Sequence, residues 1–245
     1  MLDKHSWIPA KWPAPAHIHA GTTTRLGGSS QPPFDSFNLA THVEDNPDAV
    51  LSNRALLKAY LELPEDPHWL TQVHGCEVST DERIISEADA CMTHTKGRVC
   101  VVMTADCLPV LITDREGSCV AAIHAGWKGL ELLAIAQTIE MMPAKENDLL
   151  VWLGPAIGPE AFEVGEEVRD LFLNQNSQMA DAFVNGKAEG KWLMDIYKIA
   201  RHQLASLNVG AVFGGEFCTY QDRQRFYSFR RNNITGRMAS LIWMS

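Results

Sequence analysis

The chain has 245 residues, of which 46% are apolar and 21% are charged, as in an ordinary globular protein with one large domain or two small ones. Its formal net charge of −9 at pH 7 argues against a broad surface for nucleic acid or for an anionic membrane, but it allows a local basic pocket for a small anion. The sequence shows neither a run of about 20 apolar residues nor a signal-peptide pattern, so we expect a cytoplasmic protein without a membrane span.

The first half of the chain predicts one early strand, one helix and a second, short strand. Residues 16–24 (AHIHAGTTT) suggest the first strand, and a turn-rich segment follows. Asn46 and Pro47 then begin a helix that continues over residues 48–63, since Asn is a favoured N-cap and Pro is favoured at the first helical position. Residues 68–75 (HWLTQVHG) predict a short strand that runs into a turn and places His74 at its end.

The second half predicts closely spaced strands mixed with helices. Residues 114–117 (DREG) form a hairpin turn between two apolar runs, so the flanking strands should pair directly. Hairpins mixed with helices indicate a layered α+β fold with mixed sheets. Because no repeat, low-complexity tract or linker divides the chain, we expect a single domain over residues 1–245. The expected strands are 98–104, 108–113, 118–123, 148–154, 211–215 and 238–244, and the expected helices are 130–142, 165–183 and 194–207.

Three side chains with metal-binding atoms, His74, Cys107 and His124, each precede a segment that can turn. Their spacing does not match a compact zinc finger, but catalytic zinc sites draw three ligands from separate elements and leave a fourth position open. Asp106 interrupts an apolar run, so it needs a partner or an open cleft, where it can orient a ligand or take part in proton transfer. From spacing alone, the alternative that all of these are packed core residues stays open.

The six cysteines include no C-x-x-C pair. Without a secretion signal, this pattern indicates reduced thiols rather than a disulfide framework. We expect most of them to be small core residues, and any chemistry to involve one or two.

Nearly the whole chain, from about residue 16 to the C-terminus, closely resembles the YfiH family, also called the laccase-domain or multicopper polyphenol oxidoreductase family. Its animal members include the enzyme FAMIN. The most specific motifs are TADCLPV and HAGWKG, which contain Cys107 and His124. The other matching stretches are TTTRLGG, SFNLATHVEDNP, TQVHG, WLGPAIGP with FEVG, FGGEFCTY and FYSFRR…TGRMASLIW.

The resemblance implies a single three-layer α/β/α domain with mixed sheets, related to the fold of a toxin deamidase. It also implies that His74, Cys107 and His124 bind one zinc ion. Family members cleave adenosine, inosine and methylthioadenosine with phosphate, giving the base and ribose 1-phosphate or methylthioribose 1-phosphate, and they deaminate adenosine. An older description makes the family copper-dependent polyphenol oxidases, and a bacterial branch is linked to peptidoglycan editing.

The residues favour zinc chemistry over multicopper chemistry. The chain has nine His and a single His-x-His pair, His17 and His19, too few imidazoles for a four-copper laccase. One Cu²⁺ held by two His and a Cys, with Met103 as an axial ligand, is the remaining copper alternative. An open zinc site suits deamination, because zinc lowers the pKa of its water towards 7. The H-x-E signature of zinc nucleobase deaminases is absent, so Asp106 is the candidate acid/base group.

Phosphorolysis also requires a cation that holds inorganic phosphate against the ribose. Arg25, which precedes a Gly-Gly pair, offers a guanidinium fork beside accessible backbone, and Arg230 and Arg231 are a second candidate. Asn38 can hydrogen-bond the ribose or the base. The alternatives are surface ion pairs for the arginines and a turn cap for Asn38.

Three functional hypotheses follow. The leading one is a zinc-dependent purine nucleoside phosphorylase with adenosine deaminase activity, whose partners are purine nucleosides and phosphate, and in which His74 is catalytic as a zinc ligand. The second is a hydrolase in which Cys107 is the nucleophile and His124 its base, acting on an amide such as a peptidoglycan precursor. The third is a non-catalytic metal-binding or redox protein. No sequence feature indicates an obligate protein partner.

Overall fold

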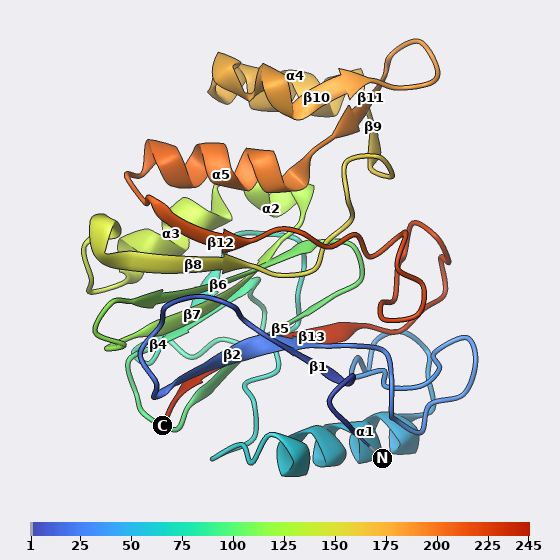
Figure 1. Ribbon diagram of the computed structural model, residues 1–245, viewed down its shortest axis with the longest axis vertical. Coiled ribbons are helices and arrows are strands. Elements are labelled where there is room, and N and C mark those ends of the chain that lie inside the picture. The colour runs from blue at the N-terminus through green and yellow to red at the C-terminus, as the bar shows by residue number, and fades with distance from the viewer. Residues whose placement is uncertain (1) are drawn as a thin grey trace.

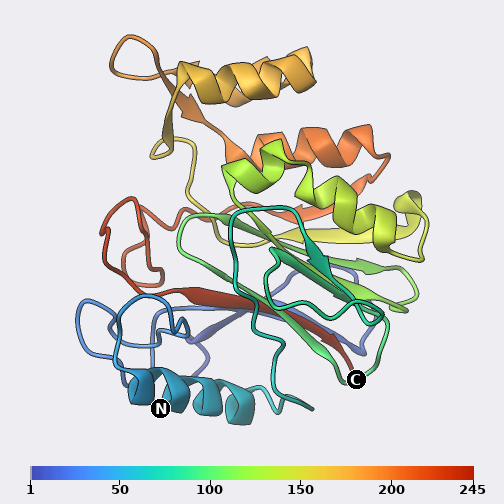
Figure 2. The ribbon, with the colours of Figure 1, turned by 180° about the vertical axis from the view of Figure 1, so that it is seen from behind.

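The computed structural model describes residues 2–245 and contains two central sheets that lie face to face (Figure 1). Helices cover both outer faces of this pair, as the view from behind also shows (Figure 2). The predicted layered α+β fold with mixed sheets is therefore confirmed, and its β layer consists of two sheets. The larger sheet is covered by α2 (Trp127–Glu131), α3 (Ala134–Met141) and α5 (Ile196–Ser206), and the smaller sheet by α1 (Pro47–Tyr60).

The larger sheet has six strands in the order β12-β8-β6-β7-β4-β3. Its centre is the antiparallel hairpin β6–β7, which has the direct pairing that the DREG turn predicts. The edge pairs β12–β8 and β3–β4 are parallel, so the sheet is mixed. Its strands are β3 (Val78–Ser79), β4 (Ala90–Thr93), β6 (Leu108–Asp114), β7 (Val120–Ala125), β8 (Leu149–Leu153) and β12 (Ala211–Gly214).

Two smaller sheets complete the β structure. The four-stranded sheet has the order β1-β2-β13-β5 and is antiparallel throughout. A three-stranded antiparallel sheet, β10-β11-β9, lies with α4 (Glu166–Gln175) at one end of the molecule (Figure 1). The remaining elements are β1 (Trp7–Pro9), β2 (Ile18–Thr23), β5 (Val99–Thr104), β9 (Glu163–Gly165), β10 (Phe183–Asn185), β11 (Lys191–Met194), β13 (Met238–Met244) and the 3₁₀ helices η1 (Glu146–Asp148) and η2 (Ser177–Ala182).

The strands β5, β6, β7 and β13 of the two main sheets are buried on both faces, which explains their continuous apolar sequences. One core lies between the sheets, where Trp152 of β8 packs with residues of β5, β6 and β13. A second core joins the larger sheet to α2, α3 and α5, and a third joins the smaller sheet to α1. This packing holds the β6–β7 hairpin rigidly from both sides.

Helix α1 begins where its sequence predicts. The side chain of Asn46 accepts hydrogen bonds from the backbone N–H groups of Asp48 and Ala49, and Pro47 occupies the first turn. Asp48 near the N-terminus and Lys58 near the C-terminus both complement the helix dipole.

The prediction of a strand over residues 68–75 is wrong. The segment forms only isolated bridges, at His68 and Thr71. Its last three N–H groups, at residues 73–75, donate to the carboxylate of Asp89 and not to a neighbouring strand. The segment is therefore a loop held by a side chain.

Two expected helices are each interrupted. The helix over 130–142 divides at Leu133, which has a left-handed backbone with φ 60°. The break leaves Leu132 and Leu133 exposed, because one helical face cannot bury every apolar residue of this run. The helix over 165–183 ends before Asn176, whose side chain caps the 3₁₀ helix η2.

No helix among residues 2–245 is long and apolar enough to span a bilayer.

Candidate functional site

His74, Cys107 and His124 converge at one end of the β6–β7 hairpin. Their ligand atoms all lie within 4.8 Å of one another, and we call these three residues the metal group. Cys107 immediately precedes β6, and His124 lies on β7 opposite Pro109, so the hairpin register itself brings the thiol and the imidazole together. His74 arrives from the loop 73–75, and its ring meets that of His124 edge to face at 4.7 Å between centroids.

Asp89 orients two residues of the metal group. It is fully buried, and its Oδ1 lies 2.7 Å from Nδ1 of His124. The same carboxylate accepts hydrogen bonds from the backbone N–H groups of Val73, His74 and Gly75 at 3.2, 3.0 and 2.7 Å. A single carboxylate thus fixes both the His124 ring and the loop that carries His74. Because Nδ1 of His124 faces Asp89, its Nε2 faces the metal group.

The charges in the site stabilise one another. Burial alone would raise the pKa of Cys107, but the charge of His124 and hydrogen bonds from His124 and His74 lower it to about 6. Burial alone would lower the pKa of His124, but the charge of Cys107 and the hydrogen bond to Asp89 raise it to about 9. Burial of Asp89 is likewise outweighed, chiefly by His124, so its pKa lies below the ordinary value. Without a metal, the site therefore favours a thiolate beside an imidazolium.

Gly126 leaves room for the thiol. A Cβ at this position would lie 2.9 Å from Sγ of Cys107 and 3.5 Å from Cδ2 of His74. This close approach explains why glycine follows the end of β7, directly before α2.

The metal group fits a zinc ion. Two imidazole nitrogens and one thiolate form a donor set of catalytic zinc sites, and ligand atoms within 4.8 Å need only small movements to surround an ion at about 2.0–2.3 Å from each. The Asp89–His124 hydrogen bond supplies the carboxylate partner that metal-bound imidazoles usually have. The three residues can therefore hold a metal ion.

Asp106 anchors the C-terminal loop. Its Oδ1 accepts a hydrogen bond from Thr219 at 2.6 Å, and its Oδ2 accepts bonds from the Ser228 hydroxyl at 3.0 Å and the Arg230 backbone at 2.7 Å. Its backbone is left-handed, with φ 97°. Of the two roles expected for Asp106, these contacts favour positioning over proton transfer.

A cavity of about 450 Å³ opens over the metal group, and we call it the site cavity. This volume is within the range of small-molecule sites, about 300–1,000 Å³. Apolar and cationic side chains both line it, which suits a ligand with a flat apolar part and an anionic part. Besides the metal group and Asp106, the lining includes Met103, Trp127, Ile157, Phe162, Ile196, Phe229, His42, Gln72, Arg230 and Arg237.

Arg25 does not reach the site cavity. Its Nε and Nη2 donate to the carbonyl oxygen of Asp35 at 2.9 and 2.7 Å, and Nη2 also pairs with the Asp35 carboxylate. Its guanidinium lies 4.8 Å from the ring centroid of Tyr227. The phosphate-binding role predicted for Arg25 lacks support from its position, because its guanidinium is engaged by groups of the protein.

Asn38 and Arg231 are likewise engaged by groups of the protein. Asn38 is fully buried, and its amide bonds the backbone of Ala40, the Asp45 carboxylate and the backbone N–H of Arg237. The guanidinium of Arg231 donates to three backbone carbonyls of the loop 219–226. Of the four substrate residues predicted from the sequence, the structure brings one, Arg230, to the site cavity.

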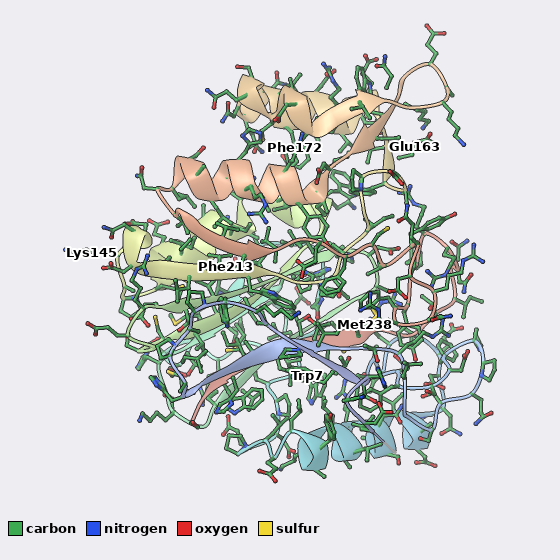
Figure 3. All side chains as sticks on the ribbon, in the orientation of Figure 1. Trp7, Lys145, Glu163, Phe172, Phe213 and Met238 are labelled. Atoms are coloured by element: carbon green, nitrogen blue, oxygen red, sulfur yellow. The ribbon has the colours of Figure 1, made fainter. Side chains whose placement is uncertain are left out.

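Sequence reasoning missed Asp89 and Arg237. Asp89 carries a signal similar to that of Asp106, a carboxylate next to a buried apolar run, here β4, which it directly precedes. Arg237 directly precedes β13, whose first residue, Met238, is labelled in Figure 3. No spacing in the sequence relates either residue to the metal group, because the contacts join distant segments.

Known proteins resemble this chain over nearly its whole length. The sequence model of the family described as multi-copper polyphenol oxidoreductase laccase matches residues 19–245. A protein of Pseudomonas aeruginosa named purine nucleoside phosphorylase is 49% identical over 241 residues, which cover 98% of this chain and 99% of that protein. The Escherichia coli protein named purine nucleoside phosphorylase YfiH is 48% identical over 240 residues, covering 97% of this chain and 98% of its own length.

Solved structures show the same fold. The crystal structure of a Neisseria meningitidis protein superimposes with a TM-score of 0.93 at 44% identity, covering 98% of this chain and 99% of that one. The crystal structure of YlmD from Geobacillus stearothermophilus gives a TM-score of 0.90 at 26% identity, covering 100% of this chain and 98% of that one.

Proposed function

The chain belongs to the family described as multi-copper polyphenol oxidoreductase laccase, and from this premise we propose that it is a zinc-dependent purine nucleoside phosphorylase that also deaminates adenosine. The observation that carries the proposal is the metal group at the base of a cavity with apolar and cationic walls. The names of the relatives from Pseudomonas aeruginosa and Escherichia coli support the phosphorylase activity. We further propose that residues 1–245 act as one cytoplasmic domain.

His74, Cys107 and His124 would hold the zinc ion, which would supply Lewis-acid chemistry to an oxygen of the substrate or of water. Asp89 keeps the His124 ring oriented and its Nδ1 engaged. Asp106 keeps the loop that carries Arg230 in place. The buried side chains of Ile157, Phe162 and Ile196 offer an apolar surface for the purine.

In phosphorolysis, one bond forms and one bond breaks. A phosphate oxygen forms a bond to ribose C1′, the C1′–N9 bond breaks with its electron pair moving to the purine, and the purine takes up a proton. Deamination instead requires water near purine C6. Because C1′ and C6 lie at opposite ends of the nucleoside, the two reactions need two poses or two sets of residues.

Of the copper alternatives, only a single bound copper ion stays open, although the description of the family implies several. Among residues 2–245, one group of His, Cys and acidic side chains can hold a metal ion, whereas a multicopper oxidase needs several. His17 and His19 contact Gly117 and Trp243 instead. Elemental analysis should find close to one zinc per chain, and several coppers with little zinc would refute the proposal.

A thiol hydrolase is the second candidate, because Cys107 and His124 form a thiolate–imidazolium pair in the metal-free site. This pair could attack an amide, such as that of a peptidoglycan precursor. Metal content separates the two functions, since a thiolate bound to zinc is a poor free nucleophile.

The deciding experiment incubates the metal-quantified protein with adenosine, inosine or methylthioadenosine, with and without phosphate, and identifies the products. We expect phosphate-dependent release of the base and, from adenosine, inosine as a second product. Cys107→Ala should lose zinc and nearly all turnover, whereas the buried Cys119→Ala should cost about 1 kcal/mol of stability and keep both. Full turnover by Cys107→Ala would contradict both the zinc and the thiol mechanisms.

A further inference from the structure

Two arginines, Arg230 and Arg237, line the site cavity without a carboxylate partner. Neither forms an ion pair with an acidic side chain of residues 2–245, although Arg25, Arg98 and Arg225 all do. A guanidinium at a cavity wall without a counter-ion is suited to bind an anionic ligand.

Arg237 is the better placed of the two. Arg230 is exposed, and its Nη1 donates to the carbonyl oxygens of Ala161 and Glu163, so its guanidinium points towards β9. Arg237 is only partly exposed, and it lies close enough to Cys107 and Asp106 for their charges to act on it. An anion at Arg237 would therefore lie in the same cavity as the metal group.

The protein fixes the Arg237 fork but leaves part of it free. Nη1 donates to the carbonyl oxygens of Thr235 and Gly236 at 2.8 and 3.1 Å, and the guanidinium lies 5.9 Å from the ring centroid of Phe229. The backbone N–H of Arg237 donates to the side chain of Asn38 at 2.9 Å. The Nε and Nη2 groups have no hydrogen-bond acceptor among residues 2–245 and are not sealed from solvent. An edge of this kind can donate two parallel hydrogen bonds to two oxygens of one phosphate.

His42 lines the same cavity as Arg237. Partial burial and the charges of Arg237, Arg54 and the metal-group histidines lower its pKa. A neutral imidazole can donate one hydrogen bond to a phosphate oxygen and adds no further positive charge.

We propose that Arg237, supported by His42 and held in place by Asn38, binds the phosphate that attacks the nucleoside. The identity of the anion rests on the proposed phosphorylase function, but its binding at Arg237 does not. Asn38 would then be a positioning residue that acts through the backbone of Arg237. The bound phosphate supplies the oxygen that bonds to C1′ as the C1′–N9 bond breaks, and the purine leaves with the electron pair and takes up a proton.

The test measures binding of inorganic phosphate to the zinc-loaded protein by calorimetry, independently of turnover. Arg237→Gln should raise the dissociation constant of phosphate by about tenfold or more, since the lost contacts are charge-assisted hydrogen bonds. Arg237→Lys keeps the charge but loses the fork, so it should fall between Arg237→Gln and the parent protein. Arg225→Gln, which removes an exposed arginine paired with Asp222, is the matched control and should stay within about twofold.

The KM for phosphate should rise in parallel, while the KM for inosine changes little. An unchanged phosphate affinity in Arg237→Gln would overturn the inference. A loss of phosphate affinity that is larger in Arg25→Gln than in Arg237→Gln would also overturn it. If Arg237→Gln fails to fold, modification of the parent protein by phenylglyoxal decides the question: phosphate should protect Arg237, and modification at an equal rate with and without phosphate would overturn the inference.

A nucleoside 5′-monophosphate carries the same chemical group, so adenosine 5′-monophosphate is measured alongside inorganic phosphate. Arg237-dependent binding of the nucleotide without binding of inorganic phosphate would overturn the assignment. Different results would refute the inference and the proposed function. Arg237-dependent phosphate binding without release of base would refute the phosphorylase, whereas phosphorolysis with an unchanged KM for phosphate in Arg237→Gln would refute the role of Arg237.

Discussion

Asp89→Asn should weaken zinc binding and destabilise the fold together. Asn has nearly the same shape as Asp, but one carboxylate oxygen becomes an NH₂ group. Oδ1 of Asp89 faces His124 and the N–H of His74, while Oδ2 faces the N–H groups of Val73 and Gly75. Whichever oxygen is replaced, the new NH₂ group is itself a donor and faces two donors that it cannot accept from.

The magnitude follows from these contacts. A fully buried donor left unsatisfied costs about 1–3 kcal/mol, but water reaches part of the loop 73–75, so the free energy of unfolding of the metal-free protein should fall by roughly 1–3 kcal/mol. Loss of the carboxylate partner of a metal-bound histidine should raise the dissociation constant of zinc by about 10- to 100-fold. The pKa of Asp89 is lowered in the folded protein, so its stabilisation is present above the ordinary value of 3.8 and is lost as the pH falls through the lower folded value. Measurements near pH 7 therefore compare an ionised carboxylate with a neutral amide.

Asp114→Asn is the matched control. Asp114 is also buried, and it accepts two hydrogen bonds of 2.6 Å from Ser118, but it lies at the end of β6 away from Cys107. Urea unfolding should show a loss of stability in both variants, and competition with a chelator should show weaker zinc binding in Asp89→Asn alone. Zinc affinity equal to that of the parent protein in Asp89→Asn would refute the role given to this carboxylate.

Three further predictions test other parts of the site and its support. Iodoacetamide should alkylate Cys107 of the metal-free protein at a rate that rises through a pH of about 6, zinc should suppress the reaction, and a midpoint near 9 would contradict the pairing with His124. Gly126→Ala should weaken zinc binding by about tenfold or more in a chelator competition, because its Cβ would lie 2.9 Å from Sγ of Cys107, whereas Gly210→Ala, whose Cβ meets nothing within 4 Å, should bind zinc normally. Tyr197→Phe should lower the free energy of unfolding by about 1–3 kcal/mol in urea without changing zinc content, because the buried hydroxyl bonds the backbone of Gly154, Ala156 and Phe217; an unchanged stability would contradict this.

The local parts of the structure were predictable from the sequence. The Asn46–Pro47 start of α1 and the hairpin around DREG depend on neighbouring residues, and both form as expected. The convergence of Cys107 and His124 follows from the hairpin as well, since strands joined by a short turn place their far ends side by side. His74 was a candidate ligand from the sequence as well, but its position depends on a contact with Asp89 that no local pattern encodes.

The anion-binding residues were not predictable in the same way. Arg25, followed by Gly27 and Gly28, has the local pattern of a phosphate site, yet Asp35 and Tyr227 engage its guanidinium. Arg237 has no such pattern and reaches the site cavity because β13 pairs with β5, the strand that precedes Cys107. A guanidinium is available to a ligand only if the fold leaves it without an internal partner, and tertiary contacts determine that.

Two carboxylates hold the site in place of a sheet ladder. Asp89 accepts the N–H groups of residues 73–75, and Asp106 joins the end of β5 to the loop that carries Thr219 and Arg230. Each carboxylate holds a segment that contains a residue with a left-handed backbone: His74 has φ 61°, and Asp106 itself has φ 97°. A left-handed backbone costs of order 1–3 kcal/mol at a residue other than glycine. A strand would avoid this cost, but its alternating side chains and paired backbone could not turn three ligands towards one open cavity. The buried carboxylates therefore compensate for the strain that the geometry of the metal group requires, and Asp89→Asn tests this because it removes the compensation while leaving all three ligands present.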